Sequence, residues 1–347
     1  MTRYLPWLIL AVFATVPLWL HDQYYLNNLI VTGIFILAAM SLNLLLGYTG
    51  QLSLGHVAFF GIGAYASALT TLGFTLTIFG VEITHDPWPA FVGLIVGTAT
   101  AGLFGYVIGK LAFRVRGAYF VIVTISFAEV VRLVALNWVE LTNGPLALPG
   151  IPPLTLGFDS LGGSVTLWDK WQNYYVVLVA IALAYLLIKN LVASPFGRAM
   201  IALRENETLA LAVGISVTRY LVLAAVFSGA LAGLAGGLYA HYIQIIDPMI
   251  FMFLNTVTMV IMVIAGGKGT LAGPIVGGLI FGFAPLILRR YVGPEVQWIL
   301  YGVLMILIVY ILPEGIVPAV ERWFDRHPET ARKPRSLRPR DAQELTP

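Results

Sequence analysis

A small set of polar side chains in this chain could bind a solute or move a proton. Asn43, Gln51, Ser53 and His56 lie close together in an otherwise apolar stretch. Amide, hydroxyl and imidazole groups supply the hydrogen-bond donors and acceptors that a polar solute needs in an apolar surrounding. A lone histidine is more often a packing residue than a ligand, and no set of metal-ligating side chains accompanies this one. The four residues are candidates for a substrate path, with packing as the alternative for His56.

A second candidate is the charged pair Glu129 and Arg132, three residues apart in another apolar stretch. At this spacing on a helix, two side chains lie on the same face and can form an ion pair. Two interpretations stay open: the pair neutralises itself near a membrane end, or Glu129 carries protons.

The sequence has no motif for nucleotide or covalent chemistry. The segment Gly267–Thr270 partly resembles a phosphate-binding loop, but it lacks the earlier Gly, and its Lys is followed by Gly instead of Ser or Thr. No catalytic triad order, paired catalytic carboxylates or dinucleotide fingerprint is present. The chain contains no Cys, which excludes disulfides and thiolate chemistry. The sequence therefore predicts a chain that is not an enzyme and that has no cofactor or metal ion of its own.

Apolar segments of membrane-spanning length make up most of the chain. Hydrophobic residues account for 59% of the sequence and charged residues for 11%, and the mean hydropathy is +0.87. A hydrocarbon core about 30 Å thick needs roughly 20 apolar residues in a helix. We therefore expect an all-α membrane protein, a polytopic bundle of about ten transmembrane helices, some of them broken at Gly-rich beginnings. The expected spans begin near residues 4, 26, 52, 88, 113, 173, 219, 249, 270 and 296.

The predicted organisation has three parts. Residues 1–25 hold a first span and its connector, and residues 26–312 form the main membrane domain. Residues 313–347 are basic and Pro-rich, and we expect a disordered tail near anionic lipid headgroups. The run Tyr4–Leu20 resembles a signal peptide in position, but it contains two prolines and no small-residue cleavage site follows it. We interpret it as an uncleaved span.

The charges of the loops predict an orientation. Most basic residues fall in loops on one side, which the positive-inside rule assigns to the cytoplasm together with both termini. The opposite loops hold mainly acidic residues. Arg289 and Arg290 fall on the unexpected side. The basic side carries Arg3, Lys110, Arg114, Arg116, Lys189, Arg198, Arg204, Arg219, Lys268 and the tail, and the acidic side carries Asp22, Glu82, Asp86, Glu140, Asp159, Asp169 and Asp247.

Two connectors are too long to be simple turns. The external loop 137–172 is rich in Gly and Pro, which is typical of ordered turns, a docking surface or a spacer. The cytoplasmic loop 189–219 contains a predicted amphipathic helix, Arg198–Val213, with Ser194 and Gly214 as its start and stop signals. This helix either lies in the solvated interface or is held by another protein.

Several segments resemble the bacterial branched-chain amino acid ABC transporter permeases of the LivM type, in the LivH/LivM permease family. The most specific segment is Gly47–Tyr65, which reads GYTGQLSLGH and then, one residue later, AFFGIGAY. Arg114–Phe120, Ser194–Gly214 and Gly266–Pro274 match in the same order. The resemblance covers residues 25–312 and does not extend to the tail. Its Gly-rich segments would be weak evidence alone, because close helix packing also favours Gly.

The resemblance implies a multi-pass permease subunit of an ABC importer in the bacterial inner membrane. Its substrates would be branched-chain or related hydrophobic amino acids. Its partners would be a second related permease, two cytoplasmic ATPase subunits that use the ATP, and an extracytoplasmic substrate-binding protein. Membrane lipid is a further partner, and no nucleic acid is expected.

In such importers a short helix of a cytoplasmic loop sits in a cleft of the ATPase. By position, the resemblance assigns this coupling role to Arg204, Glu205, Asn206, Glu207, Ala210 and Gly214. The general importer pattern has Glu-Ala-Ala and then Gly after three residues. Here Glu207-Thr208-Leu209 precedes Gly214, so the loop as a whole is a firmer prediction than any one of its residues.

Two other functions stay open. The same architecture could import a different small solute, such as urea or short amides, since close relatives share these motifs. A self-sufficient secondary transporter would instead need ionisable groups inside the membrane for ion coupling. Only Glu129 with Arg132 offers such a group, and the loop 189–219 would then have no evident role.

Overall fold

A computed structural model describes residues 13, 15–17, 22–78, 81–157, 165–288 and 293–325. Most of the expected first span, Arg289, Arg290, Asp159 and the tail beyond Asp325 lie outside the described residues. The described chain is mainly helical, which confirms the predicted class.

Its helices are α2 Gln23–Asn43, the π-helix η1 Leu44–Tyr48, α3 Val57–Leu72, α4 Ala90–Ala112, α5 Ala118–Asn137, α6 Val139–Thr142, η2 Gly144–Leu146, α7 Lys170–Ala193, α8 Pro195–Glu205, α9 Glu207–Ala212, α10 Val217–Ile243, η4 Pro248–Phe251, α11 Phe253–Gly266, α12 Gly273–Leu288, α13 Pro294–Ile311 and α14 Ile316–Asp325.

Among the described residues, five helices are long and apolar enough to cross a membrane by length and composition: α2 with η1, α4, α5, α7 and α10. Shorter apolar helices include α3, α11 and the first part of α12. These helices confirm an integral membrane protein. The total of ten spans and the side on which each terminus lies stay predictions.

Local sequence explains where several helices begin and end. The Asp22 carboxylate accepts a hydrogen bond from Tyr24 N at 2.8 Å and caps α2. Asp169 and Gln172 form a reciprocal capping box at the start of α7. Gly73 ends α3 at a φ of 71°, a conformation that costs Gly no side-chain clash. The Gly-rich beginning predicted for the third span is not helical, because α3 starts only at Val57.

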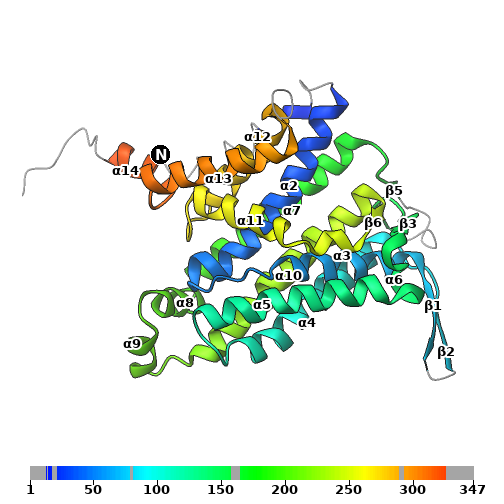
Figure 1. The fold of residues 1–347 in the computed structure, drawn as a ribbon, viewed down its shortest axis with the longest axis horizontal. Helices are drawn as coiled ribbons and strands as arrows, with labels where there is room; N and C mark the ends of the chain where they lie inside the picture. Colours follow the sequence, from blue (N-terminus) through cyan, green and yellow to red (C-terminus); the bar gives the residue numbers. More distant parts are fainter. Residues whose placement is uncertain are drawn as a thin grey trace, which may run out of the picture.

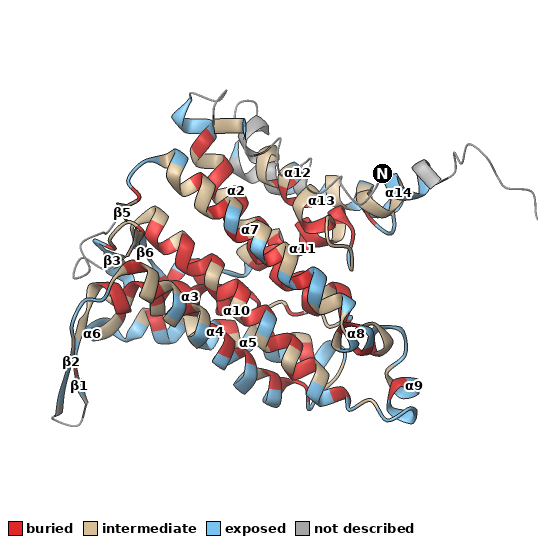
Figure 2. Ribbon diagram, turned by 180° about the vertical axis from the view of Figure 1, so that it is seen from behind, coloured by how far each residue is buried: buried red, intermediate tan, exposed pale blue. Residues whose placement is uncertain are grey.

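Most residues of α2, α3 and α10 are buried, so these helices carry the core of the bundle. Helix α10 packs against α2, α3 and α4 (Figure 1). The most apolar windows of α2 and α10 are 83% and 72% buried, whereas those of α5 and α7 are each 22% buried. Figure 2 shows the same difference, with buried residues along α2, α3, α10 and α11 and many exposed residues on α4 and α5. The outer helices therefore present apolar side chains to lipid or to other subunits.

Glycines bring the backbones of α3 and α10 into contact. A Cβ atom at Gly63 would overlap the backbone of Gly233, and one at Gly236 would overlap the carbonyl of Phe60. Small residues permit this approach, and van der Waals packing between close helices is a main source of stability in lipid. Gly233 and Gly236 of α10 therefore have a packing role.

The two ends of the molecule differ in structure (Figure 1). One end carries the antiparallel pairs β1 Phe74–Ile78 with β2 Val81–His85, β3 Leu148–Pro149 with β6 Ile245–Ile246, and β4 Thr155–Leu156 with β5 Val165–Thr166. In the first pair, Phe74 lies opposite His85 and Ile78 opposite Val81. The other end carries α8, α9 and α14. The β3–β6 pair attaches the long loop 137–172 to the segment that follows α10.

One predicted segment differs from the structure at the C-terminal end. Residues 316–325, expected to be disordered, form helix α14, which packs against α11 and α12. Arg322 forms an ion pair with Glu314 at 3.0 Å. Pro318 lies in the first turn, where a missing backbone N–H costs no helical hydrogen bond. The amphipathic pattern of this segment, and not its Pro content, decides its structure.

We predict that Gly236→Ala destabilises the protein by about 1–3 kcal/mol, because overpacking forces the two helices apart. Gly302→Ala on α13 is the matched control, since no atom lies within 4 Å of the position of its Cβ. Both variants gain the helix propensity of Ala, so their difference isolates the packing effect. Thermal unfolding of the detergent-purified protein measures the difference in stability between the two variants. Equal unfolding temperatures for the two variants would contradict a tight α3–α10 crossing.

Candidate functional site

The loop between α7 and α10 folds into two short helices, not the single helix predicted over Arg198–Val213. The Ser194 hydroxyl accepts a hydrogen bond from Gly197 N and caps α8. Asn206 interrupts the helix with an extended backbone, at a φ of −159°, and its side chain accepts from Leu209 N at 3.0 Å to cap α9. An Asn side chain competes well for backbone amides, which explains why the helix restarts at this residue.

Gly214 ends α9 as the sequence predicts. Its φ is 86°, and Ile215 N donates to Ala210 O at 3.0 Å. This left-handed termination favours Gly, because other residues pay a steric cost there. The loop is therefore bounded by Ser194 and Gly214, with an additional break at Asn206.

The residues of the predicted coupling set differ in exposure. Arg204, Glu205, Asn206 and Gly214 are exposed and Glu207 is half-buried. The remaining member, Ala210, is buried, so it packs α9 onto the rest of the chain instead of presenting a surface.

The structure adds three exposed apolar residues that sequence reasoning missed. Leu209, Leu211 and Val213 are 63%, 54% and 70% exposed, and we call them the α9 apolar tip. The sequence pattern placed Val213 on the apolar face of one continuous helix. The helix restarts after Asn206, so residues 207–213 no longer continue the helical periodicity of α8. As a result, Leu209, Leu211 and Val213 point outward. Exposed apolar groups in a polar loop are candidates for contact with another protein.

Arg204 links this loop to the membrane helices. Its Nη1 donates to Gly47 O at 2.9 Å, at the end of η1, and its Nη2 contacts Glu205 Oε1 at 2.6 Å. A Cβ atom at Gly47 would overlap the backbone N of Gly269, so the two segments lie close together here. We call this contact the Gly47–Gly269 junction. It joins the end of α2 to the loop between α11 and α12.

Asn43 holds the same junction from inside the bundle. Its Oδ1 accepts from Gly269 N at 2.9 Å, and its Nδ2 donates to Thr270 O at 2.8 Å. A predicted path residue and a predicted coupling residue therefore meet at one place. Both ends of the Asn43 amide thus hold backbone groups of the junction, and one N–H and one lone pair of the amide remain for another partner.

Among the described residues, no hydrogen bond joins His56, Ser53 or Gln51 to Asn43. His56 is fully buried, and its Nε2 lies 2.7 Å from Ser41 Oγ, whereas its Nδ1 has no partner among the described residues. Ser53 is buried and Gln51 is half-buried. All four candidates lie in described segments, and no hydrogen bond joins any two of them there. This geometry favours packing for Asn43 and His56, and a role in the path stays a prediction.

A second link connects the loop to α5. Arg116, in the turn between α4 and α5, forms an ion pair with Glu207 at 2.7 Å, and both side chains are about one-third exposed. Its guanidinium also donates to Phe113 O. Glu207, predicted to face another subunit, is thus paired within the chain. Pairs at such exposure contribute roughly 0–1 kcal/mol, so Glu207 remains free to exchange partners.

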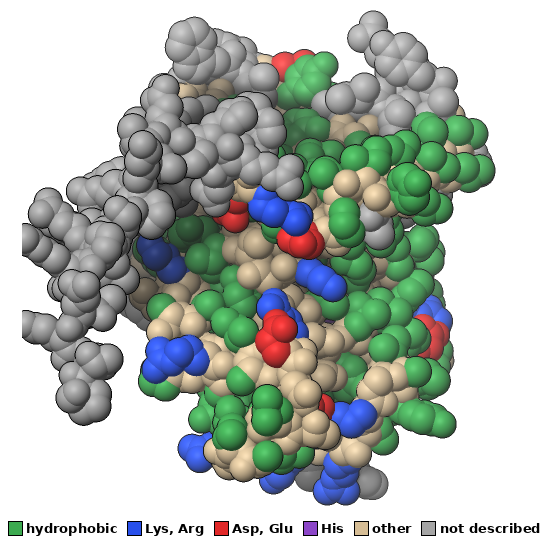
Figure 3. All heavy atoms as spheres, turned by 90° about the vertical axis from the view of Figure 1, so that its left-hand side faces the viewer, with side chains coloured by type: hydrophobic (Ala, Val, Ile, Leu, Met, Phe, Trp, Pro, Cys, Tyr) green, Lys and Arg blue, Asp and Glu red, His purple; other side chains and the backbone are tan. Residues whose placement is uncertain are grey.

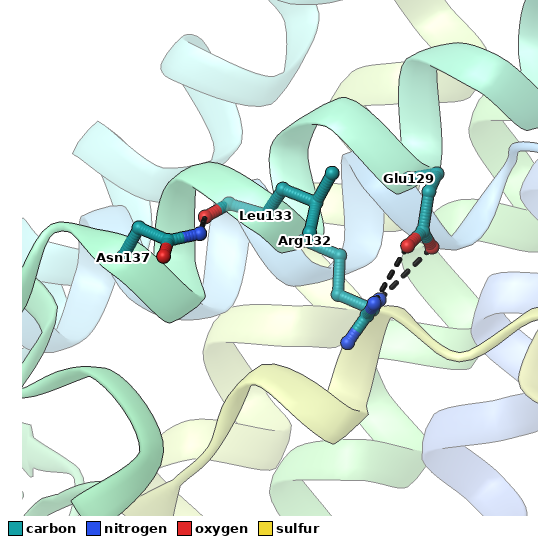
Figure 4. Close-up of polar contacts among 4 residues, drawn as sticks. All are labelled: Glu129, Arg132, Leu133 and Asn137. Atoms are coloured by element: carbon teal, nitrogen blue, oxygen red, sulfur yellow. Dashed lines mark hydrogen bonds and ion pairs between the residues drawn. The ribbon is translucent and has the colours of Figure 1, made fainter.

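Glu129 and Arg132 form a bidentate ion pair on the exposed side of α5 (Figure 4). The two hydrogen bonds are 2.6 and 2.9 Å long. One turn further on, the side chain of Asn137 donates to Leu133 O at 2.8 Å. A paired and doubly hydrogen-bonded charge is much less costly in an apolar environment than a single one. The geometry fits the self-neutralising interpretation.

Basic side chains gather at the end of the molecule that carries α8 and α9 (Figure 3). They come from the turns and short helices around the Gly47–Gly269 junction. Acidic residues dominate the opposite, strand-bearing end. The described basic residues at the first end include Arg114, Arg116, Arg198, Arg204, Arg219, Lys268 and Arg322. In the described part of the chain, no group of three or more His, Asp or Glu side chains could hold a metal ion.

Residues 24–309 match the family model described as branched-chain amino acid transport system, permease component. The chain belongs to this family. The LivM permease of the high-affinity branched-chain amino acid transport system of Salmonella typhimurium is 30% identical over 309 residues, covering 83% of this chain and 68% of the relative. The LivH permease of the same system in Escherichia coli is 28% identical over 313 residues, covering 86% and 97%. No solved structure matches the chain.

One relative belongs to a sugar transport system. The fructose import permease FrcC of Rhizobium meliloti is 27% identical over 303 residues, covering 80% of this chain and 83% of the relative. As a member of a transport permease family, the chain is a transport component and not an enzyme. Its relatives include permeases of systems for chemically different solutes.

We predict that Glu129→Gln lowers the amount of folded permease in the membrane by roughly twofold or more, because it leaves the Arg132 charge unpaired on an apolar helix. The double variant Glu129→Gln/Arg132→Gln should restore the amount, since it removes both charges. Quantitative blotting of membranes measures the amount of permease for each variant. If the double variant is abundant but inactive in uptake, the proton-carrying interpretation of Glu129 gains support instead.

Proposed function

We propose that this permease is the transmembrane subunit of an ABC importer for branched-chain or related hydrophobic amino acids in a bacterial inner membrane. Two observations support the assignment: the family match covers residues 24–309, and relatives include both LivM and LivH permeases of one transport system. The chain would pair with a second related permease and with two cytoplasmic ATPase subunits. An extracytoplasmic binding protein would deliver the solute.

The α9 apolar tip is the observation that carries the ATPase-driven mechanism. A subunit without a phosphate-binding loop must receive the energy of ATP through a contact with another protein. Leu209, Leu211 and Val213 offer an exposed apolar surface for such a contact. Arg204 then transmits its displacement to the Gly47–Gly269 junction, and Arg116 transmits it to α5. A loop that only lies in water would need neither the apolar surface nor the two links.

A second candidate function is the import of another small solute by the same mechanism. The fructose permease FrcC supports it, because that relative covers most of the chain. Urea and short amides belong to this alternative. An ion-coupled secondary transporter is less well supported, since the carboxylate of Glu129 is already paired with Arg132. Uptake of labelled leucine, urea and fructose by the reconstituted assembly separates the solutes.

In the proposed orientation, α8 and α9 lie in the cytoplasm and the strand-bearing end lies outside. We predict that cysteines introduced at Asp86 and Thr208 of this Cys-free chain react from opposite sides of the membrane, since the basic end stays inside. A membrane-impermeant maleimide should label Asp86→Cys in intact cells and Thr208→Cys only in inverted vesicles. Labelling of both positions from one side would mean that the number of spans between them is wrong.

The coupling role predicts that the double variant Leu209→Glu/Leu211→Glu abolishes ATPase co-purification and substrate-stimulated ATP hydrolysis. The charges would be desolvated in an apolar contact, whereas an exposed side chain in water tolerates substitution within about 0.5 kcal/mol. The amount of folded permease should therefore not change. Leu146→Glu is the control, because Leu146 is 77% exposed at the opposite end. Normal transport by the double variant would contradict an ATPase contact at α9.

A further inference from the structure

We propose that a cavity beside Asp247 binds the zwitterion of an amino acid with an apolar side chain. The cavity has a volume of about 300 Å³ and is lined by residues that include Phe35, Phe60, Tyr239, Ile246, Asp247 and Asn255. The inference rests on the proposed function and names a binding site within it. None of these residues belongs to the sets that the sequence predicted for the path or for coupling.

The cavity lies where the chain stops being regular helix. Gln244 ends α10 with a φ of 63°, and the segment that follows contains only β6 and η4 before α11 begins. With 14 residues, α11 is about 21 Å long, shorter than a hydrocarbon core of about 30 Å. Irregular backbone therefore reaches into the membrane region, and such backbone is tolerated where it is buried in protein or lines a cavity.

Asp247 offers a negative charge at the cavity. Its Oδ1 accepts from Met249 N at 2.9 Å, which leaves the second oxygen for another donor. No Lys, Arg or His lies within ion-pair distance of this carboxylate among the described residues, and the side chain is exposed. The rings of Phe60 and Tyr239, 5.6 Å apart, form an aromatic wall of the same cavity. A carboxylate next to aromatic faces is a suitable environment for an ammonium group.

The other side of the cavity is suited to a carboxylate. Helix α11 begins at Phe253, its N-cap residue Met252 makes no side-chain hydrogen bond, and its first turn contains no acidic residue. The backbone N of Asn255 donates to Met252 O at 3.0 Å, so the helix end acts at the cavity through its dipole, which makes this end positive. Asn255, in the first turn, lines the cavity, and its Nδ2 donates to Ile250 O at 3.0 Å. Its amide oxygen and second N–H remain available.

A carboxylate and the positive end of a helix thus flank a cavity whose lining is partly polar and partly apolar, which suits an amino acid with an apolar side chain. A volume of about 300 Å³ is at the lower end of ordinary ligand sites and suits a small solute. A sugar would need many hydrogen-bond partners, whereas most of the lining side chains are aliphatic or aromatic. Tyr65, stacked on Phe251 of η4 at 5.7 Å, has a buried hydroxyl without a partner among the described residues. A further donor is therefore present beside the same segment.

The test compares Asp247→Asn with Asp22→Asn in the assembled transporter, purified with its partner subunits in lipid nanodiscs. Both Asp residues cap a helix through one backbone amide, and Asn can do the same, so folding should be preserved. Binding of leucine, of 4-methylpentanoate, which lacks the ammonium group, and of 3-methylbutylamine, which lacks the carboxylate, is measured at equilibrium. We expect Asp247→Asn to weaken leucine binding roughly tenfold and to remove the preference for leucine over 4-methylpentanoate.

Asp22→Asn should bind all three compounds as the wild type does, and Asp247→Glu, which keeps the charge, should retain the preference for leucine. Unchanged leucine binding by Asp247→Asn would overturn the site while leaving the proposed function intact. Uptake by the wild-type assembly in vesicles separates the two claims. If it imports urea or fructose and no hydrophobic amino acid, the proposed function fails, and the zwitterion site fails with it.

Discussion

The close crossing of α3 and α10 is the contact on which the rest of the structure depends. It exists because Gly63, Gly233 and Gly236 carry no Cβ, so the two backbones meet directly. The side chain of His241 on α10 adds polar contacts to α3 and to the loop 137–172. One ring nitrogen lies 2.9 Å from Ser67 Oγ and the other 2.8 Å from Pro152 O. Helix α10 then packs against α2 and α4 and places both ends of the permease relative to its core.

The same helix connects the two functional regions that we infer. α10 begins at Val217, shortly after the α9 apolar tip, and ends at Ile243, next to the cavity beside Asp247. A packed, rigid helix can transmit a displacement from one end to the other if the segments at both ends can each adopt two conformations. Arg204 and Asn43 give the α8–α9 end a second connection, through the Gly47–Gly269 junction. An ATPase acting on α9 would thus act on the helices that surround the cavity.

The sequence predicted the helices well because their signals are local. Apolar length decides that a segment spans the membrane, and most predicted spans begin within a few residues of an observed helix. The largest offsets are five residues, at the third span, whose Gly-rich beginning stays irregular until Val57, and at the fifth, where α5 begins at Ala118. The caps Ser194 and Gly214 act through their own backbone neighbours, so they could be recognised without tertiary information. The charge asymmetry of the loops and the motif Gly47–Tyr65 were also readable, and they were enough to find the family.

Tertiary structure alone decided how the candidate residues are used. Asn43 looked like a path residue, but its partners Gly269 and Thr270 are more than 200 residues away in sequence. The break at Asn206 exposes the α9 apolar tip, because one side chain there competes successfully with the helix for backbone amides. From the sequence, Asp247 is one of several acidic residues in the predicted external loops, and no pattern singles it out. Its cavity forms where α2, α3 and α10 converge, and such long-range packing leaves no periodic signal in the sequence. Helix positions follow from local hydrophobic pattern, whereas sites follow from which distant segments come together.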